Sequence, residues 1–267
     1  MAEADVVLVE VADGVATITL NRPDARNALS TDLLRALPRA IAEADADPDV
    51  AAMVLTGADP AFCAGLDLRQ VGSGSLDLGG SGAAGGTDEA ARSRRGPFGA
   101  RTKPLIGAVN GPAVTGGLEL ALACDFLIAS ERARFADTHA RVGIQPGWGL
   151  TVLLPQWIGL PRARQMSVTG NFVDADTALR WGLVNQVVAH DDLMPTALGL
   201  ARDVASNDGP AVQRILRTYR EGISELSGAD AWAMEARVAA DWQRDFDPGE
   251  VARRREAIQS RGRSQQG

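Results

Sequence analysis

Two glycine-containing segments hold the residues of this 267-residue chain that are best suited to chemistry. Residues 60–68 directly follow a predicted strand, and residues 110–119 follow the next predicted strand and open a helix. In open α/β sheets ligands bind at the carboxyl ends of strands, and a helix N-terminus there offers unpaired N–H groups and a positive dipole end. The two segments could therefore hold a carbonyl oxygen that gains negative charge. Without such a role, Gly65, Gly116 and Gly117 are simply tight turns.

Glu119 adds an acid/base group to the second segment. It lies in the first turn of a predicted helix that is otherwise apolar, on the side that the Gly116 amide faces. A carboxylate at this position either caps the helix or acts on a ligand. Backbone dipoles together with proton transfer by a carboxylate or an imidazole can catalyse a reaction without a metal or a covalent nucleophile.

Composition and motifs argue against several other functions. The net charge of -7 and the pI of about 5.0 are unfavourable for a nucleic-acid partner, which needs a basic surface. The two cysteines, Cys63 and Cys124, and the two histidines, His139 and His190, lack the spacing of a zinc site or a disulfide framework, so we expect no metal. Neither a GxSxG nor a GxxxxGK[ST] motif occurs, and no glycine fingerprint for a dinucleotide follows a strand.

The sequence also predicts where the protein is found. It contains no stretch of about 18 apolar residues, and its start, MAEADVVLVE, lacks the positive head and apolar run of a signal peptide. We therefore expect a cytoplasmic protein with no membrane partner.

Periodicity predicts an α/β fold. Residues 6–11 and 15–20 alternate around Asp13-Gly14, which is typical of a β-hairpin. A helix with apolar residues at helical spacing follows, with Pro38 predicted to kink or break it. The remaining segments repeat a strand, loop and helix order that favours parallel strands covered by helices, with strands expected at 50–57, 104–111 and 125–130.

Two further regions have a different character. Residues 72–96 are rich in Gly, Ser and Ala, and we interpret them as a mobile loop inserted within one domain rather than as a linker between two. Beyond residue 190 the pattern is helical. We therefore predict a core domain over residues 1–190 and a helical subdomain over residues 191–267, whose apolar faces would meet another subunit.

Several ordered motifs resemble the enoyl-CoA hydratase/isomerase family, the crotonase superfamily. They are NRPDARNAL (21–29), AFCAGLDL (61–68), NGPAVTGGLELALACD (110–125) and FADTHARVGIQPGWG (135–149). The likeness extends through LPRARQMSVTGNFVDADTALRWGLVNQVV and so covers roughly residues 5 to 190. It implies a spiral of repeated ββα units, with a helical C-terminal part that packs the chains into trimers, often paired into hexamers.

The resemblance also implies a binding site for an acyl-CoA thioester. An oxyanion hole made by the backbone N–H groups of Ala64 and Gly116 would polarise the thioester carbonyl and stabilise an enolate. The segment from Ala64 through Gly65 and Leu66 to Asp67 would line the path of the adenine and pantetheine, with Gly117 beside the substrate. Arg26 is either a contact for a CoA phosphate or an ordinary surface arginine. No separate cofactor is implied, because coenzyme A is part of the substrate.

Hydratases of this family use two glutamates, and here only the first is matched. Glu119 corresponds to the first glutamate, while the place of the second holds His139, twenty residues later. His139 could replace it, because an imidazole exchanges protons near neutral pH, or it could merely hydrogen-bond within its loop. Asp137 is a third candidate. Trp148 either lines the acyl pocket or packs a turn.

The leading hypothesis is an enoyl-CoA hydratase, which adds water reversibly to a 2-trans-enoyl-CoA to give a 3-hydroxyacyl-CoA. The alternatives keep the oxyanion hole but change the reaction to double-bond isomerisation, thioester hydrolysis or carbon–carbon cleavage. A further alternative is a protein that binds acyl-CoA without turnover. The chain length and branching of the acyl group cannot be read from the sequence.

Overall fold

The computed structural model describes residues 5–73, 75, 96–143 and 145–220. The chain forms two compact units, Met1–Gln213 and Arg214–Gly267. The first unit contains every element described below, except that the last helix, α10 (Gly209–Thr218), runs across the boundary. None of the described helices is long and apolar enough to cross a membrane.

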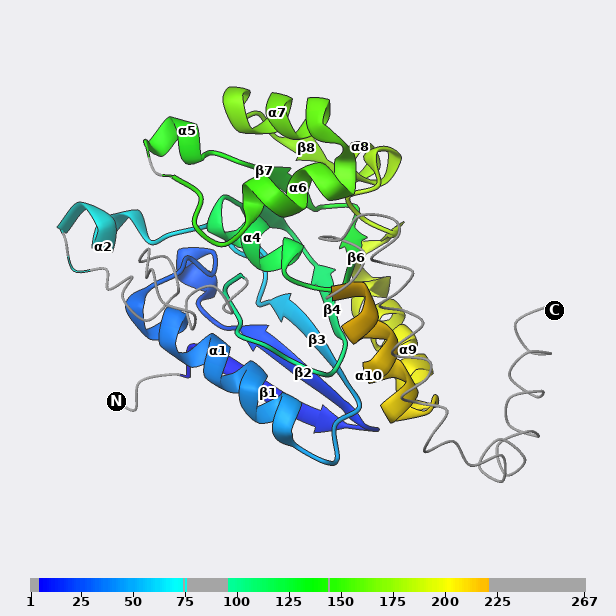
Figure 1. Ribbon diagram of the computed structural model, residues 1–267. Helices are drawn as coiled ribbons and strands as arrows, with labels where there is room; N and C mark the ends of the chain where they lie inside the picture. The colour runs from blue at the N-terminus through cyan, green and yellow to red at the C-terminus, as the bar shows by residue number, and fades with distance from the viewer. Residues whose placement is uncertain (1–4, 74, 76–95, 144, 221–267) are drawn as a thin grey trace. The chain divides into compact units, whose positions relative to one another are not determined.

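A six-stranded sheet forms the centre of the first unit (Figure 1). Its order is β1-β2-β3-β4-β6-β9, and all neighbours are parallel except β1 and β2. The strands are β1 (Val7–Ala12), β2 (Val15–Leu20), β3 (Ala52–Gly57), β4 (Leu105–Val109), β6 (Phe126–Ser130) and β9 (Gln186–Val188). The predicted hairpin and the parallel strands are therefore confirmed.

The hairpin turn forms because both of its residues adopt positive φ. Asp13 has φ 52° and Gly14 has φ 76°, which is the pattern of a type I′ turn. This turn sets the register, in which Ala12 pairs with Val15 and Val7 with Leu20. The apolar residues of β2 at every second position then point to one face.

Helices cover both faces of the sheet because its strands are apolar on both sides. Along β3, Met53 and Leu55 belong to one buried cluster and Ala52 and Val54 to the other. The first cluster includes α1 (Thr31–Ala46) and α4 (Gly116–Leu122). The second includes α9 (Leu193–Ala205), which packs on β2, β3, β4 and β6.

A second layer packs beyond α4 (Figure 1). It contains a three-stranded sheet of order β5-β7-β8 and four helices. Its strands are β5 (Pro112–Val114), β7 (Arg134–Ala136) and β8 (Val173–Asp174), and its helices are α5 (His139–Val142), α6 (Leu150–Ile158), α7 (Leu160–Thr169) and α8 (Ala175–Trp181). The shorter elements outside this layer are η1 (Pro23–Ala25), α2 (Leu68–Ser73) and η2 (His190–Asp192).

The break predicted at Pro38 does not occur, because α1 continues to Ala46. Proline inside a helix costs about 3 kcal/mol. Two features of α1 offset that cost: the Ser30 hydroxyl caps its start by accepting from the Leu33 N–H, and an apolar stripe is buried in the core. The buried residues of this stripe are Leu33, Leu34, Leu37, Ala40, Ile41 and Ala44.

The domain boundary predicted at residue 190 falls inside the first compact unit. The helix that follows it, α9, packs on the central sheet. Most of the 72–96 segment and all residues after 220 lie outside the described residues. The mobile loop and the later C-terminal helices therefore stay predictions.

Candidate active site

The two glycine-containing segments lie side by side in the structure. The Cys63 N–H donates to the Pro112 carbonyl (3.0 Å), and the Val114 N–H donates to the Cys63 carbonyl (2.9 Å). These bonds align residues 61–66 with β5, so that Gly65 and Gly116 are in contact. A Cβ placed on Gly116 would be 3.8 Å from the Gly65 Cα. The structure therefore brings together the two turns that the sequence singles out.

Packing alone explains why glycine is needed at Gly117. A Cβ at this position would lie 2.1 Å from the Cys63 carbonyl oxygen, which is far inside van der Waals contact. At Gly116 a Cβ would lie 2.9 Å from a methyl group of Leu29. The glycines thus let α4 approach the neighbouring backbone closely. The tight-turn interpretation is therefore confirmed for Gly116 and Gly117, while their role in a ligand site stays a prediction.

The residue before α4 has a strained backbone. Thr115 has φ 56° and ψ -111°, an unusual conformation for a β-branched residue. It is held there by its N–H, which donates to the Ala136 carbonyl (2.8 Å), and by a hydroxyl contact with Thr138. Strain of this kind persists only where surrounding contacts determine it, and it is common at functional sites. It presents Gly116 as the first residue of α4, where the N–H has no acceptor within the helix.

Glu119 is buried in the first turn of α4, with a relative exposure of 3%. Its Oε1 accepts from the Trp148 N–H (2.9 Å), and its Oε2 lies 3.6 Å from His139 Nε2. Burial raises the pKa of Glu119 above the usual carboxyl value, and the Trp148 hydrogen bond and His139 offset only part of that rise. Glu119 is therefore a buried carboxyl group with a raised pKa, held by the Trp148 N–H and facing His139.

His139 is also buried, at the start of α5, and it lies between two carboxyl groups. Its Nδ1 is 2.6 Å from Asp137 Oδ1, and its backbone N–H donates to the same oxygen (3.1 Å). Burial alone would raise the pKa of Asp137. Hydrogen bonds from His139 and Ser167 outweigh that effect and lower the pKa below its usual value. Both sequence candidates, His139 and Asp137, are thus part of one cluster with Glu119.

The backbone amide of Ala64 has a partner within the protein. Its N–H donates to the Arg26 carbonyl oxygen (3.0 Å). Arg26 has a left-handed backbone (φ 51°), which turns this carbonyl toward Ala64, while its side chain is exposed. The sequence places Arg26 near the site by its side chain, but in the structure its described contact with the 61–66 segment is made by its backbone.

Two residues that sequence reasoning missed hold the 21–29 turn in place. The Arg22 guanidinium pairs with Asp67 Oδ2 (3.1 Å) and also donates to the Ala28 carbonyl. Asn27 is fully buried, and its amide donates to the carbonyls of Ala58 and Ala61. The signal was the polar NRPDARN stretch between apolar elements. In the structure Asp67, predicted to line the substrate path, is ion-paired with Arg22.

Trp148 has two roles in the structure. Its backbone N–H orients Glu119, and its ring lies 3.5 Å from the position that a Cβ of Gly116 would take. The ring also lines an apolar cavity of about 10 Å³ together with residues of α1, α4 and the chain around them: Leu29, Leu33, Leu34, Leu37, Pro38, Pro97 and Leu120. Leu66 packs at the edge of the same core. Trp148 therefore packs against the start of α4 and lines this cavity, and whether it contacts an acyl group stays a prediction.

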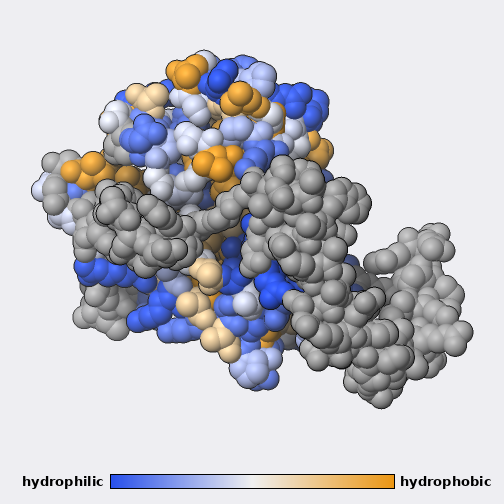
Figure 2. Space-filling view, in the orientation of Figure 1, coloured by the Kyte–Doolittle hydropathy of each residue, from blue (hydrophilic) through white to orange (hydrophobic). Residues whose placement is uncertain are grey.

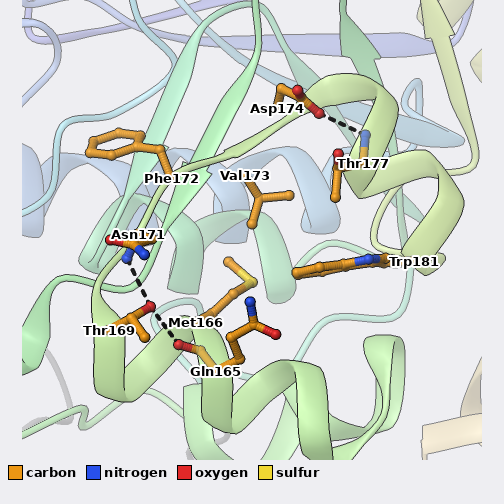
Figure 3. Close-up of a pocket in the computed structure, with 9 residues that line it drawn as sticks. All are labelled: Gln165, Met166, Thr169, Asn171, Phe172, Val173, Asp174, Thr177 and Trp181. Carbon is orange, nitrogen blue, oxygen red and sulfur yellow. Dashed lines mark hydrogen bonds between the residues drawn. The ribbon is translucent and has the colours of Figure 1, made fainter.

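A larger pocket of about 270 Å³ lies elsewhere, between α7, β8 and α8 (Figure 3). Figure 3 shows Met166, Val173 and Trp181 directed into it. The Asp174 side chain caps α8 by accepting from the Thr177 N–H (2.8 Å). None of the predicted site residues lines this pocket.

Residues 10–251 match the profile of the family described as enoyl-CoA hydratase/isomerase. The chain belongs to this family. It is 39% identical to a probable enoyl-CoA hydratase of Rhizobium meliloti and 37% identical to the short-chain-enoyl-CoA hydratase of Clostridium acetobutylicum, each over 88% of both chains. A solved structure of an enoyl-CoA hydratase from Mycobacterium smegmatis is 47% identical, with a TM-score of 0.72 over 90% of this chain and 99% of that one.

The family assignment confirms the crotonase-type α/β fold expected from the motifs. The two glycine-containing segments follow the carboxyl ends of β3 and β4 in the chain. The described residues hold no group of three or more His, Cys, Asp or Glu side chains arranged to bind a metal ion.

The close contact at Gly117 gives a prediction. Gly117→Ala places a methyl group against the Cys63 carbonyl and forces α4 away from residues 61–66. We expect a loss of stability of about 1–3 kcal/mol, measured by urea unfolding. Gly199→Ala is the matched control, because a Cβ there meets no atom within 4 Å and alanine favours the helix α9. Equal stability of the two variants would contradict the packing described.

Proposed function

We propose that this protein is an enoyl-CoA hydratase that adds water reversibly to a 2-trans-enoyl-CoA. The observation that carries the proposal is the buried contact between Glu119 and His139, made from the first turn of α4, the helix that begins at Gly116 in contact with Gly65. Such a site offers an acid/base pair and an oxyanion donor within one small region. Membership of the enoyl-CoA hydratase/isomerase family supports it.

In the proposed reaction the thioester carbonyl oxygen binds to the N–H groups of Gly116 and Ala64. These donors stabilise the negative charge that reaches this oxygen when hydroxide adds to Cβ, and one such donor contributes about 10²–10³ in rate. Glu119 accepts a proton from the attacking water as its oxygen bonds to Cβ. His139 then donates a proton to Cα of the enolate, which gives the 3-hydroxyacyl-CoA.

To bind the thioester oxygen, the Ala64 N–H must either share or give up its hydrogen bond with the Arg26 carbonyl. Its N–H donates to the Arg26 carbonyl, so the thioester oxygen has to enter alongside that carbonyl or replace it. Arg26 and Asn27 both have positive φ, at 51° and 55°. Because this turn contains two strained non-glycine residues, we propose that it shifts slightly to move the Arg26 carbonyl away from the Ala64 N–H when the substrate binds.

The rest of the substrate site follows from the same placement. The segment from Ala64 to Asp67 and the face of α4 at Gly117 are proposed to run along the pantetheine, with the exposed Arg26 side chain available to a CoA phosphate. The reaction moves only the elements of water, and coenzyme A arrives with the substrate, so no further cofactor is proposed.

Isomerisation of an enoyl-CoA is the second candidate. It is favoured by one observation, the imidazole of His139 where hydratases of the family carry a second glutamate. An isomerase needs a base to move a proton between two carbons, which Glu119 could do alone.

Assembly and location form part of the same proposal. The helices α6 and α7 expose apolar side chains, among them Val152, Leu160 and Val168, and Figure 2 shows apolar and polar side chains intermingled over this layer. These residues support association with further copies of the chain into a trimer or hexamer, which the mass from sedimentation would reveal. A cytoplasmic location is proposed from the sequence.

Glu119→Gln tests the proposed function. The amide keeps the shape of the side chain but cannot accept the proton from water, so kcat for crotonyl-CoA should fall by about 10²–10⁴ with little change in KM. The assay follows the loss of absorbance of the conjugated thioester. Glu43→Gln on the exposed face of α1 is the control and should leave kcat unchanged. Turnover of 3-enoyl-CoA alone would favour the isomerase, and binding without turnover would refute both enzymes.

The pH profile tests the state of Glu119. Its pKa is raised by burial, and the titratable groups that act on it are His139 and Asp137. As the pH falls through this raised pKa, Glu119 becomes protonated and can no longer accept a proton from water. The acidic limb of kcat/KM should therefore lie above the ordinary carboxyl value of about 4.3. A limb at or below that value would contradict the role of Glu119 as the base.

A further inference from the structure

We propose that Asp137 is a positioning residue that fixes a proton on His139 Nδ1, so that Nε2 faces Glu119 and the buried Glu119–His139 pair shares a single further proton. This inference rests on the proposed function for its catalytic consequence. Its structural part, the protonation of His139, stands on the geometry of the cluster alone.

The geometry of His139 allows one arrangement of protons. Asp137 is ionised and can only accept hydrogen bonds, and its Oδ1 is 2.6 Å from His139 Nδ1. Nδ1 therefore carries a hydrogen in both the neutral and the charged imidazole. The other nitrogen, Nε2, is left to face Glu119 Oε2 at 3.6 Å. Without Asp137, a neutral imidazole could place its proton on either nitrogen.

Both ends of this cluster are tied to separate elements. Asp137 also accepts from the His139 backbone N–H and makes a side-chain hydrogen bond with Ser167 of α7. Glu119 is held by the Trp148 N–H just before α6. The three side chains thus form a fixed row from Asp137 through His139 to Glu119, and neither carboxyl group can turn away without losing a buried hydrogen bond.

Burial limits the charge of the row. The relative exposures of Asp137, His139 and Glu119 are 1%, 5% and 3%. Two carboxylates and a neutral imidazole would place a charge of -2 in this buried space, whereas one added proton on the pair reduces it to -1. The titratable groups that act on Glu119 are His139 and Asp137, and the titratable group that acts on Asp137 is His139. One shared proton is therefore the favoured state.

This shared proton provides a complete cycle. In the active form Glu119 is a carboxylate and His139 an imidazolium. The water oxygen bonds to Cβ while its proton passes to Glu119, the π electrons of the double bond move toward Cα, and the Nε2 proton of His139 bonds to Cα. Glu119 is then protonated and His139 neutral. Transfer of that proton from Glu119 to Nε2 restores the pair, and the reverse reaction starts from the other form.

The protonation of His139 can be measured directly because the chain has only two histidines. We would record imidazole ¹⁵N shifts of labelled protein across pH and assign them with His139→Gln. When His139 becomes neutral, Nδ1 should stay protonated and Nε2 should lose its proton. His190 is an internal contrast, because its Nε2 faces Asp59 (3.0 Å) and its Nδ1 faces the Ser130 hydroxyl (3.1 Å). Loss of the Nδ1 proton from His139 would overturn the inference, and His190→Gln gives the same assignment if His139→Gln does not fold.

Kinetics of Asp137→Asn test the catalytic consequence. We expect kcat for crotonyl-CoA to fall by about 10²-fold or more with little change in KM. In a His139→Gln background the same substitution should have no further effect, because no imidazole is left to position. A purely structural role would lower the activity of both backgrounds alike.

Asp13→Asn is the matched control, because it alters an exposed aspartate that pairs with Arg202, and asparagine suits the left-handed backbone of the β1–β2 turn. It should leave kcat unchanged. An equal loss in Asp13→Asn and Asp137→Asn would overturn the positioning role. If the wild-type protein hydrates no enoyl-CoA, the proposed function fails, while the ¹⁵N result still decides the protonation of His139.

Discussion

The site depends on the burial of three ionisable groups in one row. Removing Asp137, His139 and Glu119 from water is unfavourable unless each charge is met by a hydrogen bond or an opposite charge. The fold meets this need with groups from separate elements: the Trp148 N–H, the His139 N–H and Ser167. The layer of α5, α6 and α7 beyond the main sheet therefore does more than cover α4. It supplies hydrogen-bond partners that keep the Glu119–His139 pair buried and oriented.

The oxyanion side of the site depends on a different constraint, which is close approach of backbone. Residues 61–66 and β5 are hydrogen-bonded as neighbours, and glycine at Gly117 lets α4 begin directly against the Cys63 carbonyl. Thr115 takes a strained backbone to make this turn. Packing of the surrounding core, which includes Leu29, Leu118 and Leu120, offsets the free-energy cost of this backbone conformation. Rigid elements on both sides thus fix the Gly116 amide relative to Glu119.

Local patterns predicted much of the fold and singled out residues that the structure brings together, Glu119, His139 and Asp137. Alternation and Asp13-Gly14 predicted the hairpin, short apolar runs predicted the parallel strands, and ordered motifs indicated the family, Glu119 and His139. Contacts between distant segments could not be predicted in this way. The Ala64–Arg26 bond and the Arg22–Asp67 pair join turns far apart in sequence. The continuous helix through Pro38 and the packing of α9 on the sheet likewise reflect tertiary burial, which overrides local propensity.

A crystal structure of the protein with a saturated acyl-CoA such as butyryl-CoA would test the proposed site most directly. The thioester oxygen should lie about 2.7–3.2 Å from the amide nitrogens of Gly116 and Ala64, with Arg26 displaced or sharing its bond. Glu119 and His139 should face Cα and Cβ from the same side of the acyl chain. A thioester bound away from these amides, or with its reacting carbons out of reach of Glu119, would contradict the proposal.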